Sequence, residues 1–322
     1  MDCLLAALGL VILLLAGDSL VRGAVNLALR MGIPALVVSL TIVAFGTSAP
    51  ELLIAIKAVA DNAPDIAMGN VVGSNTANIL MVLGFPALLA AMHTSECDTR
   101  KNYLYMIASS VLFIALAFRG VFDVLAGVVL LAALAAVLTD SFLHARNHRR
   151  DTRAAEAAMD SDELEDLEGA DPELPWWKIG VFLLLGLIGL PLGADILVDS
   201  SVNIARDFGV TETVIGLTLV ALGTSLPELA TTVMAALRRQ ADVALGNVIG
   251  SNMFNLLAII GITALLGEIP VDPQFLKFDL WVMLASSLLL IPFVFLKRDI
   301  TRSWGVLLVG LYLAYISAVV LS

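Results

Sequence analysis

The sequence predicts an all-α polytopic membrane protein with ten transmembrane helices, arranged as two inverted-topology five-helix repeats. Three observations lead to this prediction. Hydrophobic residues make up 59% of the 322 residues and charged residues 15%, whereas soluble domains have about 45–50% and about 25%. Long apolar segments recur along the whole chain, and motifs of the first half return in the second half at constant spacing.

Ten apolar segments can account for the predicted helices, because about 20 residues suffice to cross ~30 Å of hydrocarbon. Six segments contain no charged residue: 3–17, 102–118, 124–139, 179–194, 280–296 and 303–322. Four contain Gly and acidic residues, and the first three of them also contain Pro: 34–60, 65–92, 211–237 and 242–268. No basic residue precedes Arg22, so we expect a retained first helix rather than a cleaved signal peptide.

The basic residues indicate the orientation of these helices. If the N-terminus lies outside, fourteen of the 18 Lys and Arg residues fall on one side of the membrane. Basic loops favour the cytoplasm. We therefore expect a multi-pass protein of the plasma membrane (the inner membrane in a bacterium), with its N-terminus and C-terminus both outside.

The acidic residues are concentrated in one polar segment. Net charge is −11, which argues against a nucleic-acid partner. Ten carboxylates lie within 151–173: Asp151, Glu156, Asp160, Asp162, Glu163, Glu165, Asp166, Glu168, Asp171 and Glu173. We interpret 144–175 as an acidic cytoplasmic linker between a first repeat (1–143) and a second (176–322). A regulatory Ca²⁺ site in it is the alternative, which the absence of EF-hand-like spacing disfavours.

The repeat is carried by two motifs in each half. GTSAPE at 46–51 returns as GTSLPE at 223–228, and GNVVGSN at 69–75 returns as GNVIGSN at 246–252, both with an offset of 177 residues. Asn78 and Asn255 keep the same offset. Five helices per half is an odd number, so the second half enters the membrane from the opposite side. Inverted repeats with Gly/Pro-interrupted helices are typical of secondary transporters.

The interrupted segments carry oxygen ligands for a hard cation. Pro50 and Pro227 lack an N–H and break the helical hydrogen bonding before them, which is tolerated at membrane depth only where the backbone is buried or lines a wet cavity. Each break also holds hydroxyls and a carboxylate, and the second motif adds further hydroxyls and amides. The polar residues at the breaks are Thr47, Ser48, Glu51, Ser74, Asn75 and Asn78, with Thr224, Ser225, Glu228, Ser251, Asn252 and Asn255.

Charge narrows the choice of cation. No Lys or Arg lies within the motifs to neutralise Glu51 or Glu228, and a buried carboxylate is costly unless it is paired or binds a cation. Two carboxylates call for one divalent ion, or for monovalent ions or protons in exchange. A site of oxygen ligands that replaces the ion's water suits Ca²⁺ better than Mg²⁺, because Mg²⁺ keeps its waters and demands tight octahedral geometry. The alternative is a structural pair of protonated glutamates hydrogen-bonded to Ser or Asn.

These four motifs resemble those of the sodium/calcium exchangers of the cation/calcium exchanger superfamily, in the prokaryotic form with two alpha repeats. The resemblance implies Na⁺/Ca²⁺ antiport by alternating access, with exchange that is electrogenic. It implies that Ca²⁺ is held by the carboxylates of Glu51 and Glu228 and the backbone carbonyls of Thr47 and Thr224. It implies Na⁺ sites at Ala44, Ser48, Glu51, Ser74, Ala221, Ser225, Glu228 and Ser251, with Asn78 and Asn255 near the centre.

Details of the motifs distinguish branches of that superfamily. Potassium-dependent members carry Asp where Asn255 stands, so we expect no K⁺ requirement. The Thr-Ser pairs favour sodium over protons. A Ca²⁺/H⁺ antiporter and, more distantly, a cation channel stay open as alternatives. We expect no enzyme and no cofactor, since no Ser–His pair or zinc-ligand cluster lies in the apolar segments, and we expect Na⁺, Ca²⁺ and the lipid bilayer as partners of a monomer.

Overall fold

The computed structural model describes residues 1–156, 171, 174–209 and 221–321, the backbone alone being described at 145–156, 221, 320 and 321. The described part is almost entirely helical. Its first half consists of α1 (Asp2–Met31), α2 (Ala35–Val38), the π-helix η1 (Ser39–Val43), α3 (Ala44–Thr47), α4 (Ala49–Ala60), α5 (Pro64–Ala77), the π-helix η2 (Asn78–Val82), α6 (Gly84–Leu89), the 3₁₀-helix η3 (Thr94–Glu96), α7 (Arg100–Ala117), β1 (Val121–Phe122) and α8 (Val124–Glu156).

The described residues of the second half are also almost entirely helical. They consist of α9 (Trp176–Asp207), α11 (Ala221–Gly223), α12 (Leu226–Leu237), α13 (Ala241–Met253), the π-helix η5 (Phe254–Ile259), α14 (Ile260–Leu266), β2 (Ile269–Pro270), the π-helix η6 (Phe275–Asp279), α15 (Leu280–Leu288), α16 (Ile291–Val294) and α17 (Arg302–Leu321).

The helices have the length and composition of membrane spans. Among the described residues, seven helices are long and apolar enough to cross a bilayer, or eight if the pair Ala35–Thr47 and Ala49–Ala60, bent by 42°, is one span. Large apolar side chains on α1 and α9 are exposed, such as Leu15 (64%) and Ile188 (65%), as lipid-facing helices require. The predicted number of ten spans remains a prediction.

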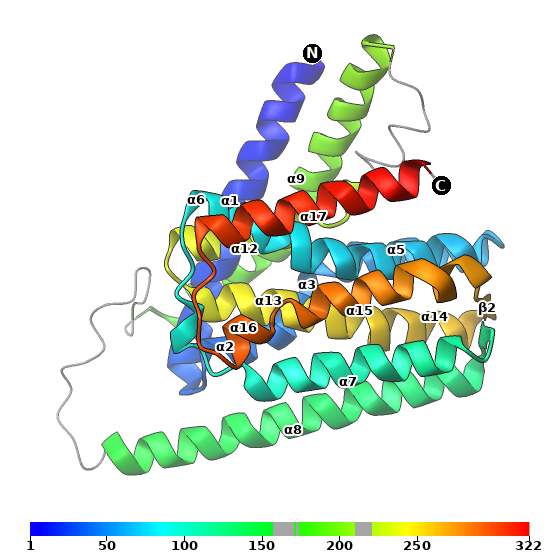
Figure 1. Ribbon diagram of the computed structural model, residues 1–322. Helices are drawn as coiled ribbons and strands as arrows, with labels where there is room; N and C mark the ends of the chain where they lie inside the picture. Colours follow the sequence, from blue (N-terminus) through cyan, green and yellow to red (C-terminus); the bar gives the residue numbers. More distant parts are fainter. Residues whose placement is uncertain (157–170, 172–173, 210–220, 322) are drawn as a thin grey trace.

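Helices α1 and α9 lie side by side and cross the other helices at a steep angle (Figure 1). Their backbones approach closely at glycines. A Cβ at Gly9 would lie 2.7 Å from the Leu197 nitrogen, and one at Gly193 would lie 2.8 Å from the Leu13 nitrogen. Small residues are what permits such contact between membrane helices.

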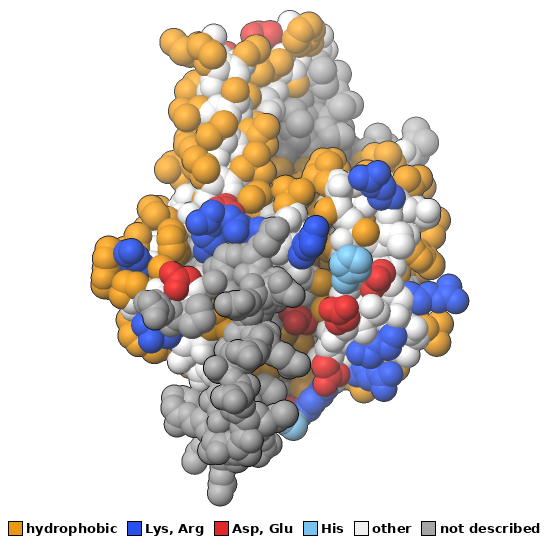
Figure 2. All heavy atoms as spheres, turned by 90° about the vertical axis from the view of Figure 1, so that its left-hand side faces the viewer, with side chains coloured by type: hydrophobic (Ala, Val, Ile, Leu, Met, Phe, Trp, Pro, Cys, Tyr) orange, Lys and Arg blue, Asp and Glu red, His pale blue; other side chains and the backbone are white. Residues whose placement is uncertain are grey.

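An ion-pair cluster connects α1 to the turn between α12 and α13. Asp18 pairs with Arg22 one helical turn later, at 3.0 Å, and with Arg238 at the end of α12. In Figure 2, which shows the left-hand side of Figure 1, Lys, Arg, Asp and Glu side chains gather in a band below a hydrophobic projection.

Two short β contacts join distant connections of the chain. β1 pairs antiparallel with β2, with Phe122 opposite Ile269, at one end of the helix bundle. Met92, between α6 and α7, pairs with Ile300, between α16 and α17.

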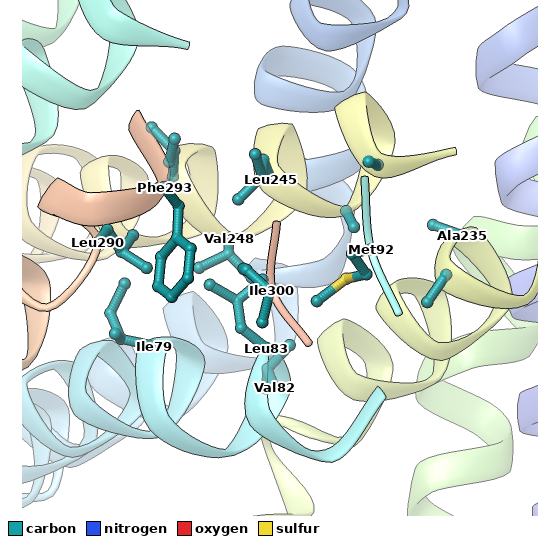
Figure 3. Close-up of a cluster of buried hydrophobic side chains, with 14 of the residues drawn as sticks. Ile79, Val82, Leu83, Met92, Ala235, Leu245, Val248, Leu290, Phe293 and Ile300 are labelled. Carbon is teal, nitrogen blue, oxygen red and sulfur yellow. The ribbon is translucent and has the colours of Figure 1, made fainter. Parts of the chain in front are cut away.

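Apolar side chains from both halves form the core beneath the second of these contacts. Figure 3 shows Val82 at the end of η2 and the next residue, Leu83, directed toward Val248 of α13. Phe293 and Ile300 lie beside them. All are buried. The motif helices are therefore held by packing between the halves.

The structure differs from the sequence-based segmentation at one place. Helix α8 continues to Glu156. It therefore includes residues 144–156, which were predicted from their polarity to begin the linker. Charged residues with high helix propensity, such as Arg and Glu, extend a helix beyond its apolar part. Most of the acidic segment, 157–170 and 172–173, lies outside the described residues.

Candidate cation-binding site

The two motif glutamates occupy equivalent places at two helix breaks. The chain leaves helical geometry at Ser48 (φ −85°, ψ 4°) and at Ser225 (φ −88°, ψ 3°). Proline near the start of each following helix suits this break, because its missing N–H would have no helical partner there. Glu51 and Glu228 lie in the first turns of α4 and α12, where the partial positive charge of a helix N-terminus favours a carboxylate.

Both carboxylates are buried and lie close together. Each glutamate is 1% exposed, and they are near enough to repel one another electrostatically. The Ser48 hydroxyl of the first half donates to Glu228 Oε1 of the second half at 3.3 Å. The other three carboxylate oxygens have no hydrogen-bond partner. A buried carboxylate pair that the protein compensates so poorly is costly when ionised, and a bound cation or a proton removes that cost.

The remaining ligands available are neutral oxygens. Among the described residues, no group of three or more His, Cys, Asp or Glu side chains converges on a point. Thr47 is buried, and its hydroxyl lies 3.3 Å from Asn247 Oδ1 and 3.4 Å from the Ser251 hydroxyl. The Thr47 and Ser251 hydroxyls also lie beside Glu228. The site thus combines carboxylate and hydroxyl oxygens from both halves, the set that Na⁺ and Ca²⁺ accept.

The hydroxyls of the second break have a different environment. The buried oxygens Thr224 Oγ1 and Ser225 Oγ have no hydrogen-bond partner, whereas their counterparts Thr47 and Ser48 do. Ser74 and Ser251 are buried on α5 and α13. The first break therefore contacts the second half more closely than the second break contacts the first.

A pair of asparagines orients the two breaks. Asn70 Nδ2 donates to the Glu51 carbonyl at 3.4 Å, and Asn247 Nδ2 donates to the Glu228 carbonyl at 3.3 Å. These two asparagines were not predicted as site residues. Their place in the repeated GN motif was the available signal.

Four further asparagines form a reciprocal network between α5–η2 and α13–η5. Asn75 Nδ2 donates to the Asn252 carbonyl, and Asn252 Nδ2 donates to the Asn75 carbonyl, both at 3.2 Å. Asn78 Nδ2 donates to Asn252 Oδ1, and Asn255 Nδ2 donates to Asn75 Oδ1, both at 3.0 Å. These bonds determine the amide orientation, and they leave Asn78 Oδ1 and Asn255 Oδ1 buried without a donor.

The remaining predicted residues are the two alanines. Ala44 is buried in α3, and its carbonyl accepts from the Ser48 nitrogen at 3.0 Å and lies 3.3 Å from Thr47 Oγ1. Ala221 begins α11, and its side chain lies outside the described residues. The structure thus brings Thr47, Ser48 and Ser251 to Glu228.

Comparisons with known proteins identify the family of this chain. The family model described as "Sodium/calcium exchanger protein" matches residues 2–142 and 178–321. The sodium/calcium exchanger MaX1 of Methanosarcina acetivorans is 35% identical, with 97% of each chain covered. The inner membrane protein YrbG of Escherichia coli is 31% identical, with 97% of this chain and 95% of YrbG covered.

A solved structure gives the same result at the level of the fold. The sodium-calcium exchanger NCX_Mj, soaked with Na⁺ and Sr²⁺, superposes with a TM-score of 0.80 at 30% identity, covering 98% of this chain and 97% of that chain. Sequence and fold agree over nearly the whole length, and the resemblance of the motifs is confirmed. The chain is a multi-pass membrane protein that belongs to the sodium/calcium exchanger family.

Proposed function

We propose that this protein exchanges Na⁺ for Ca²⁺ across the membrane by alternating access. The observation that carries the proposal is the buried pair of Glu51 and Glu228, three of whose four carboxylate oxygens have no protein donor. The family is one of transporters, so the chain is a transporter and not an enzyme. The relatives MaX1 and NCX_Mj are named as sodium/calcium exchangers.

In this proposal Ca²⁺ is bound by the carboxylates of Glu51 and Glu228 and the backbone carbonyls of Thr47 and Thr224. Ca²⁺ takes 6–8 oxygens, and two bidentate carboxylates with two carbonyls supply about six. Sodium ions use the same glutamates, together with Ala44, Ser48, Ser74, Ala221, Ser225 and Ser251. Shared carboxylates make the two cations compete, and competition couples their fluxes.

Asn78 and Asn255 complete the proposed site as neutral ligands. Their Oδ1 atoms are buried and lack donors, so they can contribute to a cation without adding charge. We therefore propose exchange that needs no K⁺, and that moves net charge because one Ca²⁺ and several Na⁺ share two carboxylates.

We also propose the ten-helix topology, with two inverted repeats, both termini outside, a cytoplasmic segment at 144–175 and function as a monomer. Equivalent residues share unusual conformations, as Gly32 and Gly209 do with φ of 62° and 75°. The two β contacts are also related by the 177-residue offset. Met92, which pairs with Ile300, corresponds to Ile269, which pairs with Phe122. In Figure 1 the connection between α16 and α17 lies at the opposite end of the bundle from β2, which supports the inverted arrangement.

Alternating access in this proposal involves α1 and α9 moving together against the other helices. Their mutual contact is a close glycine-mediated one, whereas large side chains on their outer surfaces are exposed. A pair that packs tightly internally can shift as one body against a fixed site.

Equilibrium binding of ⁴⁵Ca²⁺ to the purified protein tests the shared site. We expect Na⁺ to displace Ca²⁺ competitively, with K⁺ and choline having no effect at equal ionic strength. Displacement by protons but not by Na⁺ would instead indicate a Ca²⁺/H⁺ antiporter. Single-channel currents from the protein in planar bilayers would indicate a channel.

A further inference from the structure

Asn247 on α13 connects the two helix breaks of the candidate site. Its side chain and the residues it contacts are buried. The amide nitrogen Nδ2 donates to the Glu228 carbonyl at 3.3 Å and to the Thr232 hydroxyl at 3.2 Å. The amide oxygen Oδ1 lies 3.3 Å from the hydroxyl of Thr47, which belongs to the first break. One side chain therefore contacts Glu228 of one half and Thr47 of the other.

Thr232 helps to fix the orientation of this amide. An amide nitrogen has two hydrogens, and in Asn247 one is donated to the Glu228 carbonyl and the other to Thr232. A flipped amide would place Oδ1 against the Glu228 carbonyl, and two acceptors would then face each other without a hydrogen, which is costly in a buried place. Oδ1 is thereby held toward Thr47.

The first repeat lacks the second of these acceptors. The residue 177 positions before Thr232 is Ala55, and an alanine side chain accepts no hydrogen bond. Asn70, which corresponds to Asn247, donates to the Glu51 carbonyl at 3.4 Å. Of the two repeats, the second alone therefore has a hydroxyl at the position that orients the motif asparagine.

The Thr47 hydroxyl lies beside Glu228 and has a single proton. A hydroxyl binds a cation through its oxygen, so its proton has to point away from the ion to another acceptor. Two carbonyl oxygens are within reach of that proton, the Ala44 carbonyl and Asn247 Oδ1, both at 3.3 Å. The Ala44 carbonyl already accepts from the Ser48 nitrogen. Among the described residues, Asn247 Oδ1 has no donor other than Thr47.

We propose that Asn247, oriented by Thr232, is a positioning residue that makes the Thr47 hydroxyl a ligand of the transported cation. Asn247 Oδ1 accepts the Thr47 proton when a cation lies at Glu228, and the lone pairs of Thr47 Oγ1 then face that ion. This inference rests on the proposed exchange function. It adds a hydroxyl ligand, and the chain of hydrogen bonds that supports it, to the carboxylates and backbone carbonyls of the proposed site.

Equilibrium binding of ⁴⁵Ca²⁺ to the purified protein in the absence of Na⁺ tests the inference. Thr232→Val removes the hydroxyl and keeps the shape of the side chain. We expect the dissociation constant for Ca²⁺ to rise about tenfold, because residues that orient a metal ligand account for about 10–100-fold in affinity. Thr232→Ser keeps the acceptor and is expected to bind Ca²⁺ as the unmodified protein does. Thr232→Ala, which copies Ala55 of the first repeat, is expected to behave as Thr232→Val does.

Thr231→Val is the matched control for the loss of a buried hydroxyl. Thr231 is the adjacent residue of α12, it is also buried, and its hydroxyl donates to the Pro227 carbonyl at 2.8 Å. It makes no contact with Asn247 in the described structure. The dissociation constant of this variant is therefore expected to be unchanged.

A double-mutant cycle distinguishes positioning from a packing defect. Thr47→Val removes the hydroxyl that Asn247 positions, and we expect it to weaken Ca²⁺ binding about tenfold by itself. On that background Thr232→Val has no hydroxyl left to position, so the double variant is expected to bind Ca²⁺ as Thr47→Val does. Independent defects would instead multiply, to about a hundredfold.

Unchanged Ca²⁺ affinity in Thr232→Val and Thr232→Ala, an equal loss in Thr231→Val or Thr232→Ser, or multiplied effects in the double variant would each overturn the inference. These results leave the proposed function intact. An absence of Na⁺-driven Ca²⁺ uptake by the unmodified protein would overturn the proposed function instead.

Discussion

Glu51 and Glu228 are placed by local backbone chemistry rather than by a charged partner. Each follows a proline in the first turn of a helix, and an asparagine holds its carbonyl. Among the described residues, neither forms an ion pair with a basic side chain. Two negative charges held in this way in a membrane interior are an arrangement that a cation stabilises.

Neutralising either glutamate is expected to weaken ion binding without destabilising the fold. Glu51→Gln and Glu228→Gln keep the shape of the side chain but remove a negative charge from the site. We expect each to lower Na⁺-driven Ca²⁺ uptake more than about a hundredfold, which corresponds to ~2.7 kcal/mol. The thermal unfolding temperature of the ion-free protein is expected to stay equal or rise, because a buried charge has been removed.

Glu268→Gln is the matched control, since Glu268 is exposed and outside the site. Full exchange activity in Glu228→Gln would show that the site has been assigned wrongly.

Because Asn255 is neutral, the proposed site has two carboxylates rather than three. Its amide donates to Asn75 Oδ1 at 3.0 Å, and Asn255→Asp replaces that donor by an oxygen while adding a third negative charge. We expect slower exchange that now depends on an additional cation such as K⁺. The measurement is ⁴⁵Ca²⁺ uptake with K⁺ replaced by choline, in the variant, the unmodified protein and the exposed control Asn203→Asp. A K⁺ requirement already present in the unmodified protein would contradict the account.

At the scale of the elements, α13 packs tightly against the first half of the chain. It lies against α2, η1 and α3, and its glycines allow the contact. Small residues permit such close approach between membrane helices.

Gly250→Ala tests the packing of α13 against η1 and α3. The added Cβ would lie 2.5 Å from the Leu40 carbonyl oxygen and 2.6 Å from Ala44 Cβ, so it pushes η1 and α3 away from α13. Overpacking of this kind costs about 1–3 kcal/mol. We expect a lower unfolding temperature in detergent and slower exchange.

Gly310→Ala in α17 is the control for that substitution. Gly310 is exposed and no atom of the described residues lies within 4 Å of a Cβ there, so the unfolding temperature is expected to change little. Equal destabilisation by the two substitutions would contradict the tight packing of α13 against η1 and α3.

Much of the fold is encoded in patterns that a single sequence displays. Apolar length predicted the helices, and repeated proline and glycine predicted the breaks, which the structure places at Ser48 and Ser225. The π-helices η2 and η5 were not predicted, because periodicity does not separate them from α-helix. The extension of α8 to Glu156 was missed because polarity was read as loop.

The residue types of the site were easier to predict than the hydrogen bonds between them. Oxygen-rich side chains at duplicated breaks indicated a cation site without any structure. The reciprocal bonds of Asn75 with Asn252 depend on contact between residues 177 positions apart, which spacing alone does not reveal. Tyr315 and Asp279 come from segments without a repeated motif, so only the structure reveals that their side chains are hydrogen-bonded to one another.

On the scale of the whole molecule, charge and shape divide the protein into parts with separate roles. Ten of the 29 acidic residues lie within 151–173, far along the chain from the motifs. The motif helices are buried between the halves, and α1 and α9 stand beside them with lipid-facing surfaces (Figure 1). A buried core beside a separate helix pair provides a fixed site and a movable partner.

The central claim, that this molecule couples Ca²⁺ movement to Na⁺, is tested most directly by ⁴⁵Ca²⁺ uptake into proteoliposomes at constant pH. Vesicles loaded with Na⁺ and diluted into choline are expected to accumulate Ca²⁺, and uptake is expected to stop when Na⁺ is equal on both sides. Accumulation that ignores the Na⁺ gradient and follows an imposed pH gradient would contradict the account.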